Sequence, residues 1–345
     1  MKKYIPVAVL AGIAGLFILG GEVSPSRREA VFYPMGGIPF RVIAFGRDAS
    51  DFLKDLSAAE KRVEKLEDVF NSFRRTSEIS RINDEAHGRP FKMSADMKRV
   101  VESSIGWWKK SDGAFDITVG PLIKLWGAAG EKKGLPDISQ LEAALQSVGT
   151  EKIEIRDDGI QIKMKGMEIG LGAIAKGDIA DQVAEMLKKR GVRRGVVDAG
   201  GNVVVFGDKT FRFGIQDPTA KAGERIIGVI EMSEGSIVTS GNYERFVAIG
   251  GKKYSHIIDP KSGMPIDNGL EAATVIADKS IDADALATAL MVMGREKAIE
   301  LLRKNPEYKG ILVEKNGDMY IVWVESDLIS NTHFEEPWSD WIRTF

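Results

Sequence analysis

The sequence contains no cysteine and only three histidines, His87, His256 and His333. Disulfide bonds and thiolate chemistry are therefore excluded, so stability must come from the core and catalysis from oxygen and nitrogen groups. Long basic runs are also absent, and the formal net charge is −2. Because phosphate binding by nucleic-acid proteins needs clustered Lys and Arg, nucleic acid is not an expected partner.

Several catalytic signatures are missing as well. The chain has no G-x-S-x-G, no P-loop and no G-x-G-x-x-G that opens a helix. These absences argue against a serine hydrolase, an NTPase and a Rossmann dehydrogenase. What is present is ordinary for a globular protein, with 43% hydrophobic and 28% charged residues among 345. A chain of this length can bury a substantial core.

The amino-terminal segment has the pattern of a targeting signal. Two lysines precede an uncharged, almost wholly apolar run from Tyr4 to Gly21. This is the pattern of a secretory signal, but the cleavage site is poor and the run is close to the roughly 20 residues that span a bilayer. We therefore expect residues 1–23 to be a signal peptide or an N-terminal membrane anchor. Residues 24–345 should form an exported domain, periplasmic or on the outer face of the cytoplasmic membrane.

The rest of the chain mixes helical and strand patterns without regular alternation. Apolar residues at helical spacing, including Leu53 and Leu56, predict an amphipathic helix over residues 49–70. Further helices are expected at 94–111 (N-cap Ser94), 138–148, 172–190 and 282–294. Strands are expected at 31–46, 153–170, 194–207, 211–275 and 311–324, the last as a hairpin around Asn316-Gly317. This mixture predicts an α+β fold, with mixed or antiparallel sheets and packed helices in a single two-lobed catalytic module.

The sharpest chemical signal lies in SIDADALATALMVMG. Asp284 and Thr288 are four residues apart and so share one face of a helix. A carboxylate beside a hydroxyl supplies hard oxygen ligands, which suit magnesium, with manganese as a plausible substitute. The alternative is that Asp282 or Asp284 only caps the helix; both readings hold if Asp282 caps and Asp284 binds metal.

The segment LGAIAKGDIAD, residues 171–181, places small residues before a helix. Small residues let a ligand approach the backbone, and the first N–H groups of a helix attract phosphate. Lys176 adds a positive charge there. Tight packing between helices also produces small-residue stretches, so the segment alone does not decide between a phosphate site and close helix packing.

Three further segments carry polar groups at turns. His256 ends a strand and runs directly into Asp259-Pro260, where an imidazole can accept a proton near neutral pH, although a backbone-bonded histidine fits equally well. In SDGAFDITVG, Phe115 offers an aromatic face and Asp116 a carboxylate, with a buried core Phe as the commoner alternative. The stretch VVDAGG offers Asp198 beside glycines.

Taken in order, these pieces resemble the ApbE family of FAD:protein FMN transferases. The matching segments are MG (35–36), SEISRIN, GAFDITVGPLIKLWG, GAIAKG, VDAGGNV, VTSGNYERF, YSHIIDPKSGMPI and ADALATALMVMG. They run from about Met35 to about Gly294. Eight segments in the same order form a specific signature.

The resemblance implies an α+β fold with FAD bound in a cleft between lobes and magnesium at its pyrophosphate. It implies transfer of FMN from FAD to a Thr or Ser hydroxyl of a target flavoprotein, with formation of a phosphoester and release of AMP. Expected acceptors are subunits of redox complexes or exported flavoproteins that carry a flavinylation motif. An exported FAD pyrophosphatase, giving FMN and AMP, and a non-catalytic FAD-binding protein remain alternatives.

The resemblance also implies roles for individual residues. Asp284, Thr288 and the backbone oxygen of Ala173 match the magnesium ligands, and His256 matches the base that activates the acceptor hydroxyl. The positions that match contacts to FAD are Met35, Phe73, Ala114, Phe115, Asp116, Lys176, Asp198 and Ile258.

Three positions depart from the family's pattern. Gly170 stands where many members carry Asp, Phe73 where Tyr is common, and Ala287 where some members place a further carboxylate. These departures leave the expected machinery in place but bear on FAD affinity and on the balance between transfer and hydrolysis.

Overall fold

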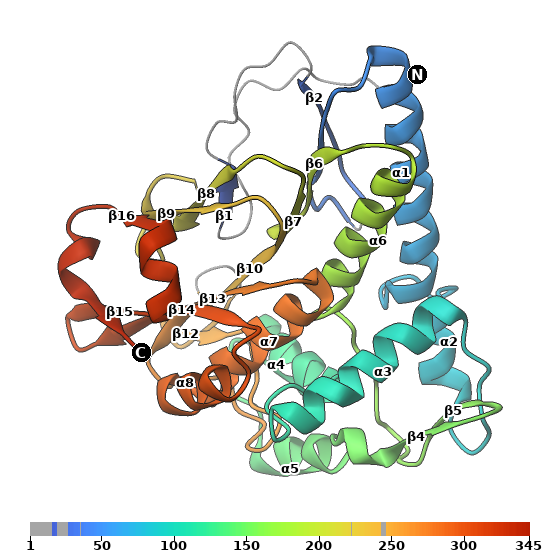
Figure 1. The fold of residues 1–345 in the computed structure, drawn as a ribbon. Coiled ribbons are helices and arrows are strands. Elements are labelled where there is room, and N and C mark those ends of the chain that lie inside the picture. Colours follow the sequence, from blue (N-terminus) through green and yellow to red (C-terminus); the bar gives the residue numbers. More distant parts are fainter. Residues whose placement is uncertain (1–15, 19–26, 35, 222, 243–245) are drawn as a thin grey trace.

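The computed structural model describes residues 16–18, 27–34, 36–221, 223–242 and 246–345 (Figure 1). Within this part of the chain, a nine-stranded sheet has the order β17-β15-β14-β13-β10-β7-β6-β3-β2. All neighbours are antiparallel except β15 and β17. The strands are β2 (Arg27–Phe32), β3 (Phe40–Phe45), β6 (Arg194–Ala199), β7 (Asn202–Phe206), β10 (Gly235–Gly241), β13 (Leu270–Ala277), β14 (Lys309–Asn316), β15 (Met319–Val324) and β17 (Ile342–Thr344).

The large sheet separates two hydrophobic cores. Along β6 and β7, successive side chains point to opposite faces, so Val197 and Val204 face one core while Val196, Val203 and Val205 face the other. The second core is closed by a smaller sheet in the order β1-β8-β9-β16. Its strands are β1 (Leu16–Ile18), β8 (Phe211–Gln216), β9 (Ile226–Met232) and β16 (Thr332–Phe334).

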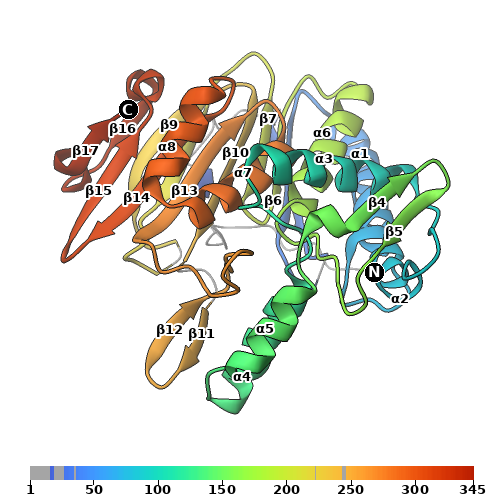
Figure 2. The same cartoon turned by 90° about the horizontal axis from the view of Figure 1, so that it is seen from below.

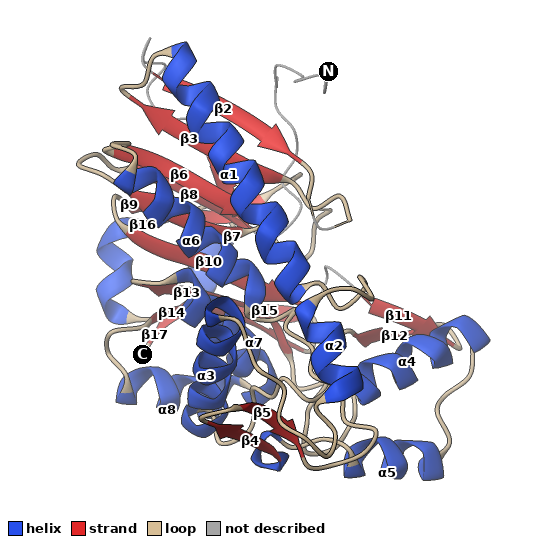
Figure 3. Cartoon of the chain, turned by 90° about the vertical axis from the view of Figure 1, so that its right-hand side faces the viewer, coloured by secondary structure: helices blue, strands red, loops and turns tan. Residues whose placement is uncertain are grey.

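Helices cover the other face of the large sheet, as Figure 3 shows. α6 packs on β6 and β7, and α7 packs on β10, β13 and α6. The helices are α1 (Ala49–Phe70), α2 (Glu78–Glu85), α3 (Ala95–Lys110), α4 (Gly120–Lys132), α5 (Ile138–Gln146), α6 (Ala175–Lys189), α7 (Ser280–Met293) and α8 (Arg295–Lys304). Short 3-10 turns occupy Thr150–Lys152, Ser326–Asn331 and Trp338–Trp341.

Ion pairs join the helices of this layer. Arg62 of α1 contacts Asp96 of α3, with 2.7 Å between Nη2 and Oδ1. Arg99 of α3 donates two hydrogen bonds of 2.8 Å to Asp178 of α6, which is buried. Such two-pronged contacts fix orientation as well as distance, so α1, α3 and α6 form one rigid support for α7.

A small arm projects from this body (Figure 2). It consists of the hairpin β11 (Phe246–Ile249) and β12 (Lys252–Ser255), whose strands pair with each other, together with α4 and α5. Leu122, Trp126 and Ala129 of α4 share a separate hydrophobic cluster with Ile249 and Ile258. A further hairpin, β4 (Ile153–Arg156) with β5 (Gly159–Ile162), lies beside α2.

The structure confirms the predicted α+β class. The expected helix over 49–70 is α1, and Ser94 caps α3, its Oγ accepting a hydrogen bond from Met97 N. One local expectation is wrong: Leu53 is not on the buried face of α1 but is exposed, and Phe52 is buried instead. The glycine-rich stretch around Gly127, to which the sequence assigned no element, forms α4.

Of residues 1–23, only Leu16–Ile18 lie in the described part of the chain, as β1 paired with β8. No helix among the described residues combines the length and apolar character needed to cross a bilayer. The signal peptide, the anchor and the cleft between two lobes therefore stay predictions.

Candidate functional site

The amino-terminal ends of α6 and α7 meet at a very short distance. Gly177 permits this, because a Cβ atom there would lie 2.2 Å from the carbonyl oxygen of Ser280. Asp181, one turn further along α6, accepts hydrogen bonds of 2.9 Å from the backbone N–H groups of Ser280 and Ile281. One helix thereby caps the other, which fixes the backbones of their first turns relative to each other.

Asp284 lies at this junction and is almost fully buried. Its Oδ1 is 3.2 Å from Lys176 Nζ, and its Oδ2 accepts a hydrogen bond of 3.1 Å from Gly177 N. The carboxylate is thus held between an ammonium group and the first turn of a helix.

Asp282 does not cap α7, contrary to one of our expectations. The helix begins at Ser280, with Lys279 in the cap position. Asp282 lies inside the first turn, where its Oδ1 accepts a hydrogen bond of 2.8 Å from Trp107 Nε1 of α3. Its role in the described structure is to fasten α7 to α3.

Thr288 lies one turn beyond Asp284 on α7, and its Oγ1 is 3.5 Å from Ser240 Oγ of β10. Ala173 is half-buried just before α6. Within the described ranges, no three His, Cys, Asp or Glu side chains come together as metal ligands. The available donors are one carboxylate, one hydroxyl and one carbonyl. This all-oxygen set, with a single carboxylate, fits a magnesium ion that also takes oxygens from a bound phosphate.

Asn202, the first residue of β7, completes the group. Its side-chain Oδ1 accepts a hydrogen bond of 3.2 Å from Lys176 Nζ, and the residue is only 2% exposed. Its Nδ2 is buried and has no hydrogen-bond partner in the part of the chain described here. A buried polar group without a hydrogen-bond partner destabilises the folded state by about 1–3 kcal/mol. Asn202 is therefore a candidate functional residue rather than a stabilising one.

Two other carboxylates near these elements have raised pKa values. Burial raises the pKa of Asp181 to about 7, against the opposing effect of its two backbone hydrogen bonds. Burial also raises the pKa of Asp198, whose Oδ1 accepts a hydrogen bond of 2.8 Å from Gly201 N. Groups with shifted pKa values cluster at functional sites, although Asp181 also has the structural task described above.

The carboxylate of Asp116 is held by hydrogen bonds from two threonines. Both carboxylate oxygens of Asp116 accept hydrogen bonds, from the backbone N–H and hydroxyl groups of Thr118 and Thr150. Phe115 is part of the main core, and Ala114 is buried. Contact of these three residues with FAD stays a prediction; the structure shows that Asp116 holds the loop in shape.

His256 follows the last residue of β12 at the base of the arm and is exposed. The loop after it is fastened at two points. Trp126 Nε1 donates a hydrogen bond of 2.9 Å to the carbonyl of Gly263, and Lys261 Nζ lies 2.7 Å from Asp112 Oδ2. The second contact brings the 256–261 segment to the 111–116 segment, and Asp112, Asp116, Pro260 and Lys261 line one hollow.

Other positions singled out in the sequence are Met35, Phe73, Ile258 and Gly170. Met35 lies outside the described residues. Phe73 is 99% exposed in the turn after α1, and Ile258 is buried in the cluster beneath the arm. At Gly170 no atom lies within 4 Å of the place where a Cβ would stand, so the position has room for a larger side chain.

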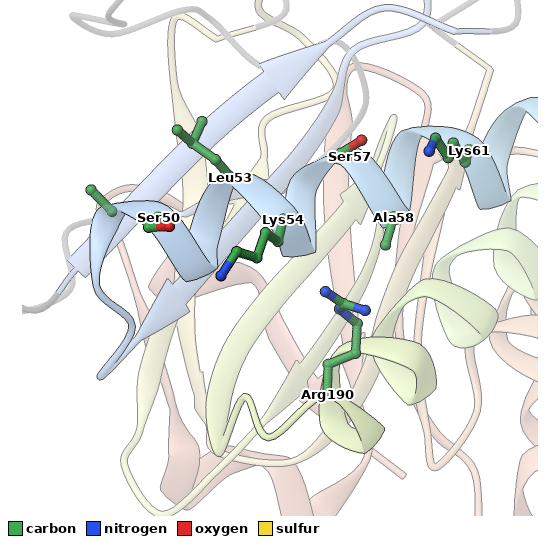
Figure 4. A pocket seen from close by; sticks show the side chains of 8 residues that line it. Ser50, Leu53, Lys54, Ser57, Ala58, Lys61 and Arg190 are labelled. Carbon is green, nitrogen blue, oxygen red and sulfur yellow. The ribbon is translucent and has the colours of Figure 1, made fainter.

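A second hollow lies on the outer face of α1 and is shown in Figure 4. It is lined by residues of α1 from Ala49 to Lys61 and by Arg190 at the end of α6. Because Arg190 is 14 residues beyond Lys176, the two positions are about 20 Å apart along the helix axis. This hollow is therefore separate from the α6–α7 junction.

Sequence reasoning missed three members of the site. Asn202 stands within the matched VDAGGNV segment, but only its neighbour Asp198 was singled out. Ser240 and Asp181 carry no local signal, because their partners Thr288 and Ser280 are far away in the chain.

Comparisons with known proteins point to one family. The model of the ApbE family matches residues 37–312. A FAD:protein FMN transferase of Klebsiella pneumoniae (strain 342) is 34% identical over 261 residues, which cover 75% of this chain and 82% of that protein. A FAD:protein FMN transferase of Escherichia coli (strain K12) is 30% identical over 342 residues, covering 93% and 95%.

Solved structures give the same result. The flavin transferase ApbE from Vibrio cholerae superposes with a TM-score of 0.78 at 28% identity, covering 88% of this chain and 99% of that one. The apo form of Pseudomonas stutzeri flavinyl transferase ApbE has a TM-score of 0.75 at 27% identity, covering 86% and 93%.

Proposed function

This chain belongs to the ApbE family, and we propose that it is an enzyme that transfers FMN from FAD to a Thr or Ser hydroxyl of a partner flavoprotein and releases AMP. The observation that carries the proposal is the buried Asp284 carboxylate, held by Lys176 and Gly177 with Thr288 one turn away. The names of the relatives support the class of reaction.

A divalent cation is part of the proposal. Asp284, Thr288 and the carbonyl of Ala173 would hold magnesium, which when bound offsets negative charge on a pyrophosphate. Manganese would suit the same oxygen ligands.

The protein's own groups have defined tasks in the proposed reaction. Lys176, at the positive end of the α6 dipole, attracts and orients the pyrophosphate of FAD. His256 accepts the proton of the acceptor hydroxyl while the oxygen of that hydroxyl bonds to the FMN phosphorus. The bond from that phosphorus to the bridging oxygen breaks, and AMP leaves with the electron pair. The products are a phosphoester-linked FMN and AMP.

The proposal also covers the acceptor protein and the cellular location of the enzyme. We propose an exported enzyme, acting in the periplasm or on the outer face of the cytoplasmic membrane, with residues 1–23 as signal peptide or anchor. Its acceptor is a flavoprotein, a redox-complex subunit or an exported protein, that presents a flavinylation motif.

The test uses the full chain, purified in detergent, with FAD, magnesium and an acceptor that carries a threonine flavinylation motif. Mass spectrometry measures FMN on the acceptor, and chromatography measures AMP. We expect an adduct that disappears with Asp284→Ala and in chelator. The matched control is Asp282→Ala, which removes a carboxylate from the same helix turn and should keep the activity.

Other outcomes have clear meanings. Free FMN and AMP without an adduct on any acceptor would identify an FAD pyrophosphatase. Intact FAD in every sample would leave a binding protein and refute the proposed function.

A further inference from the structure

Asn202 is a buried amide with one described partner. Its Oδ1 accepts from Lys176 Nζ, while its Nδ2 is enclosed without a partner among the described residues. Because an ammonium group only donates hydrogen bonds, the amide must turn its oxygen to the lysine. The orientation of Asn202 is therefore set by Lys176, and the amide in turn restrains the lysine.

Lys176 is held at a position that matters for the proposed metal. Its Nζ lies 3.2 Å from both Asn202 Oδ1 and Asp284 Oδ1. Two cations a few ångströms apart repel each other strongly at a buried carboxylate. A divalent cation on Asp284 and the ammonium group in its present place therefore exclude each other.

The three side chains differ in their freedom to move. Asn202 and Asp284 are almost fully buried, and Asp284 is also bonded to Gly177 N. The Lys176 side chain is 27% exposed and long, on the first turn of α6. The lysine is the member that can leave.

We infer that Asn202 is a positioning residue: with Asp284 it holds the Lys176 ammonium where a divalent cation would bind, and it releases the lysine when that cation arrives. Lys176 then turns to the negatively charged phosphoryl oxygens of the dinucleotide. This inference rests on the proposed function and adds to it an exchange of ionic contacts. No covalent bond changes in the exchange.

The first experiment measures binding of Mn²⁺ to the full chain without FAD, using the electron paramagnetic resonance signal of free Mn²⁺. Lys176→Met and Asn202→Leu should each bind Mn²⁺ roughly ten-fold more tightly than the unaltered chain, the effect of removing one hydrogen bond to a charged group. Asp284→Ala should abolish this binding. Asn305→Leu, which removes a part-buried amide bonded to the carbonyl of Leu301, is the matched control and should change nothing.

The double variant tests whether Asn202 acts through the lysine. If it does, Asn202→Leu has no further effect on Mn²⁺ affinity once Lys176→Met is present. Simple loss of positive charge cannot explain a gain in Asn202→Leu, because that variant keeps the charge. An independent effect of Asn202 in the double variant would overturn the inference.

A second readout follows the lysine itself. Mass spectrometry measures how fast an amine reagent labels Lys176. In the unaltered chain we expect slow labelling, faster labelling when Mg²⁺ is added, and protection when FAD follows. Asn202→Leu should be labelled fast without metal. Should this variant fail to fold, as judged by circular dichroism, Lys176→Met and the labelling of the unaltered chain still decide the question.

The outcomes separate the two proposals. Asp284-dependent Mn²⁺ binding whose affinity is the same in Lys176→Met, or labelling that Mg²⁺ leaves unchanged, refutes the exchange and leaves the proposed function intact. Absence of any Asp284-dependent Mn²⁺ binding refutes the exchange together with the metal site of the proposed function.

Discussion

The α6–α7 junction and the β11–β12 arm are built in opposite ways. At the junction, Gly177 lets two helices touch, Asp181 caps one from the other, and Asp284 is buried between them. In the arm, a two-stranded ribbon whose strands pair with each other packs on α4 through one small cluster. The dinucleotide half of the proposed site is thus part of the core, whereas His256 lies at the base of a peripheral ribbon. Changes in the two regions should separate FAD binding from transfer.

His256→Ala should have the largest effect. Loss of a general base reduces the rate of FMN transfer by roughly 10²–10⁴-fold. The side chain is exposed, so the free energy of unfolding should change by less than about 0.5 kcal/mol. Mass spectrometry of the acceptor measures the first quantity and urea denaturation the second.

The control for this variant is His333→Ala, which removes another exposed histidine, on β16. It should leave transfer unchanged. Added imidazole should partly restore His256→Ala. An unchanged transfer rate in His256→Ala would show that the arm does not supply the base.

Gly177→Ala should have the next largest effect and should act on the core. The added Cβ would meet the carbonyl of Ser280 at 2.2 Å, which forces α6 and α7 apart. Overpacking of this kind costs about 1–3 kcal/mol and should lower the melting temperature by several degrees. FAD affinity, measured by flavin fluorescence, should fall with it.

The matched control is Gly127→Ala in α4, where nothing lies within 4 Å of the added Cβ. This change should be neutral or stabilising by about 0.5–1 kcal/mol, because Ala favours a helix over Gly. Equal melting temperatures for Gly177→Ala and the unaltered chain would mean that the junction tolerates separation.

Asp181→Asn should change how the stability that the α6–α7 junction contributes depends on pH. Burial raises the pKa of Asp181 from 3.8 to about 7, so the folded chain holds a proton more tightly than the unfolded chain. This stabilising contribution is complete below pH 4 and is lost as the pH rises through 7. Relative to Asp181→Asn, the unaltered chain should lose on the order of 1–2 kcal/mol between pH 5 and pH 8. Urea denaturation at both pH values checks this, and parallel pH curves would contradict it.

Gly130→Ala should have the smallest effect and should act on the arm alone. The added Cβ would meet Val247 Cγ1 at 2.2 Å, but a side chain can turn aside where a carbonyl cannot. We expect transfer to slow a few-fold while FAD affinity stays the same and stability changes by about 0.5 kcal/mol. A loss of FAD affinity in this variant would show that the arm also belongs to the dinucleotide half.

Local signals in the sequence predicted much of the fold. The apolar spacing of α1 predicted a helix with the bounds that the structure has, and Ser94 was identified as the cap of α3. The hairpin was predicted around Asn316-Gly317; in the structure Asn316 pairs with Met319, so the two-residue loop is Gly317-Asp318, with a φ of 64° at Gly317. Each of these features depends on residues within a few positions of one another.

The site was predictable only where its chemistry shows within one segment. Asp284 and Thr288 stand on the same helix face and were found in this way. Asp282 was misassigned as a cap because its partner, Trp107, lies 175 positions away, and the true cap comes from α6. Asn202 was missed because its link to Lys176 exists only after β7 and α6 have packed.

The hydrogen bonds from Ser280 and Ile281 to Asp181 join positions that lie 99 and 100 residues apart. Between them the chain forms β6 to β10 and β13, strands of the two larger sheets. We expect these strands to pair before α7 packs against α6. Contacts of such long separation form slowly, because the entropy of closing the loop is lost before the contacts are gained. During refolding, the ability to bind dinucleotide should therefore appear late, after most of the secondary structure has returned.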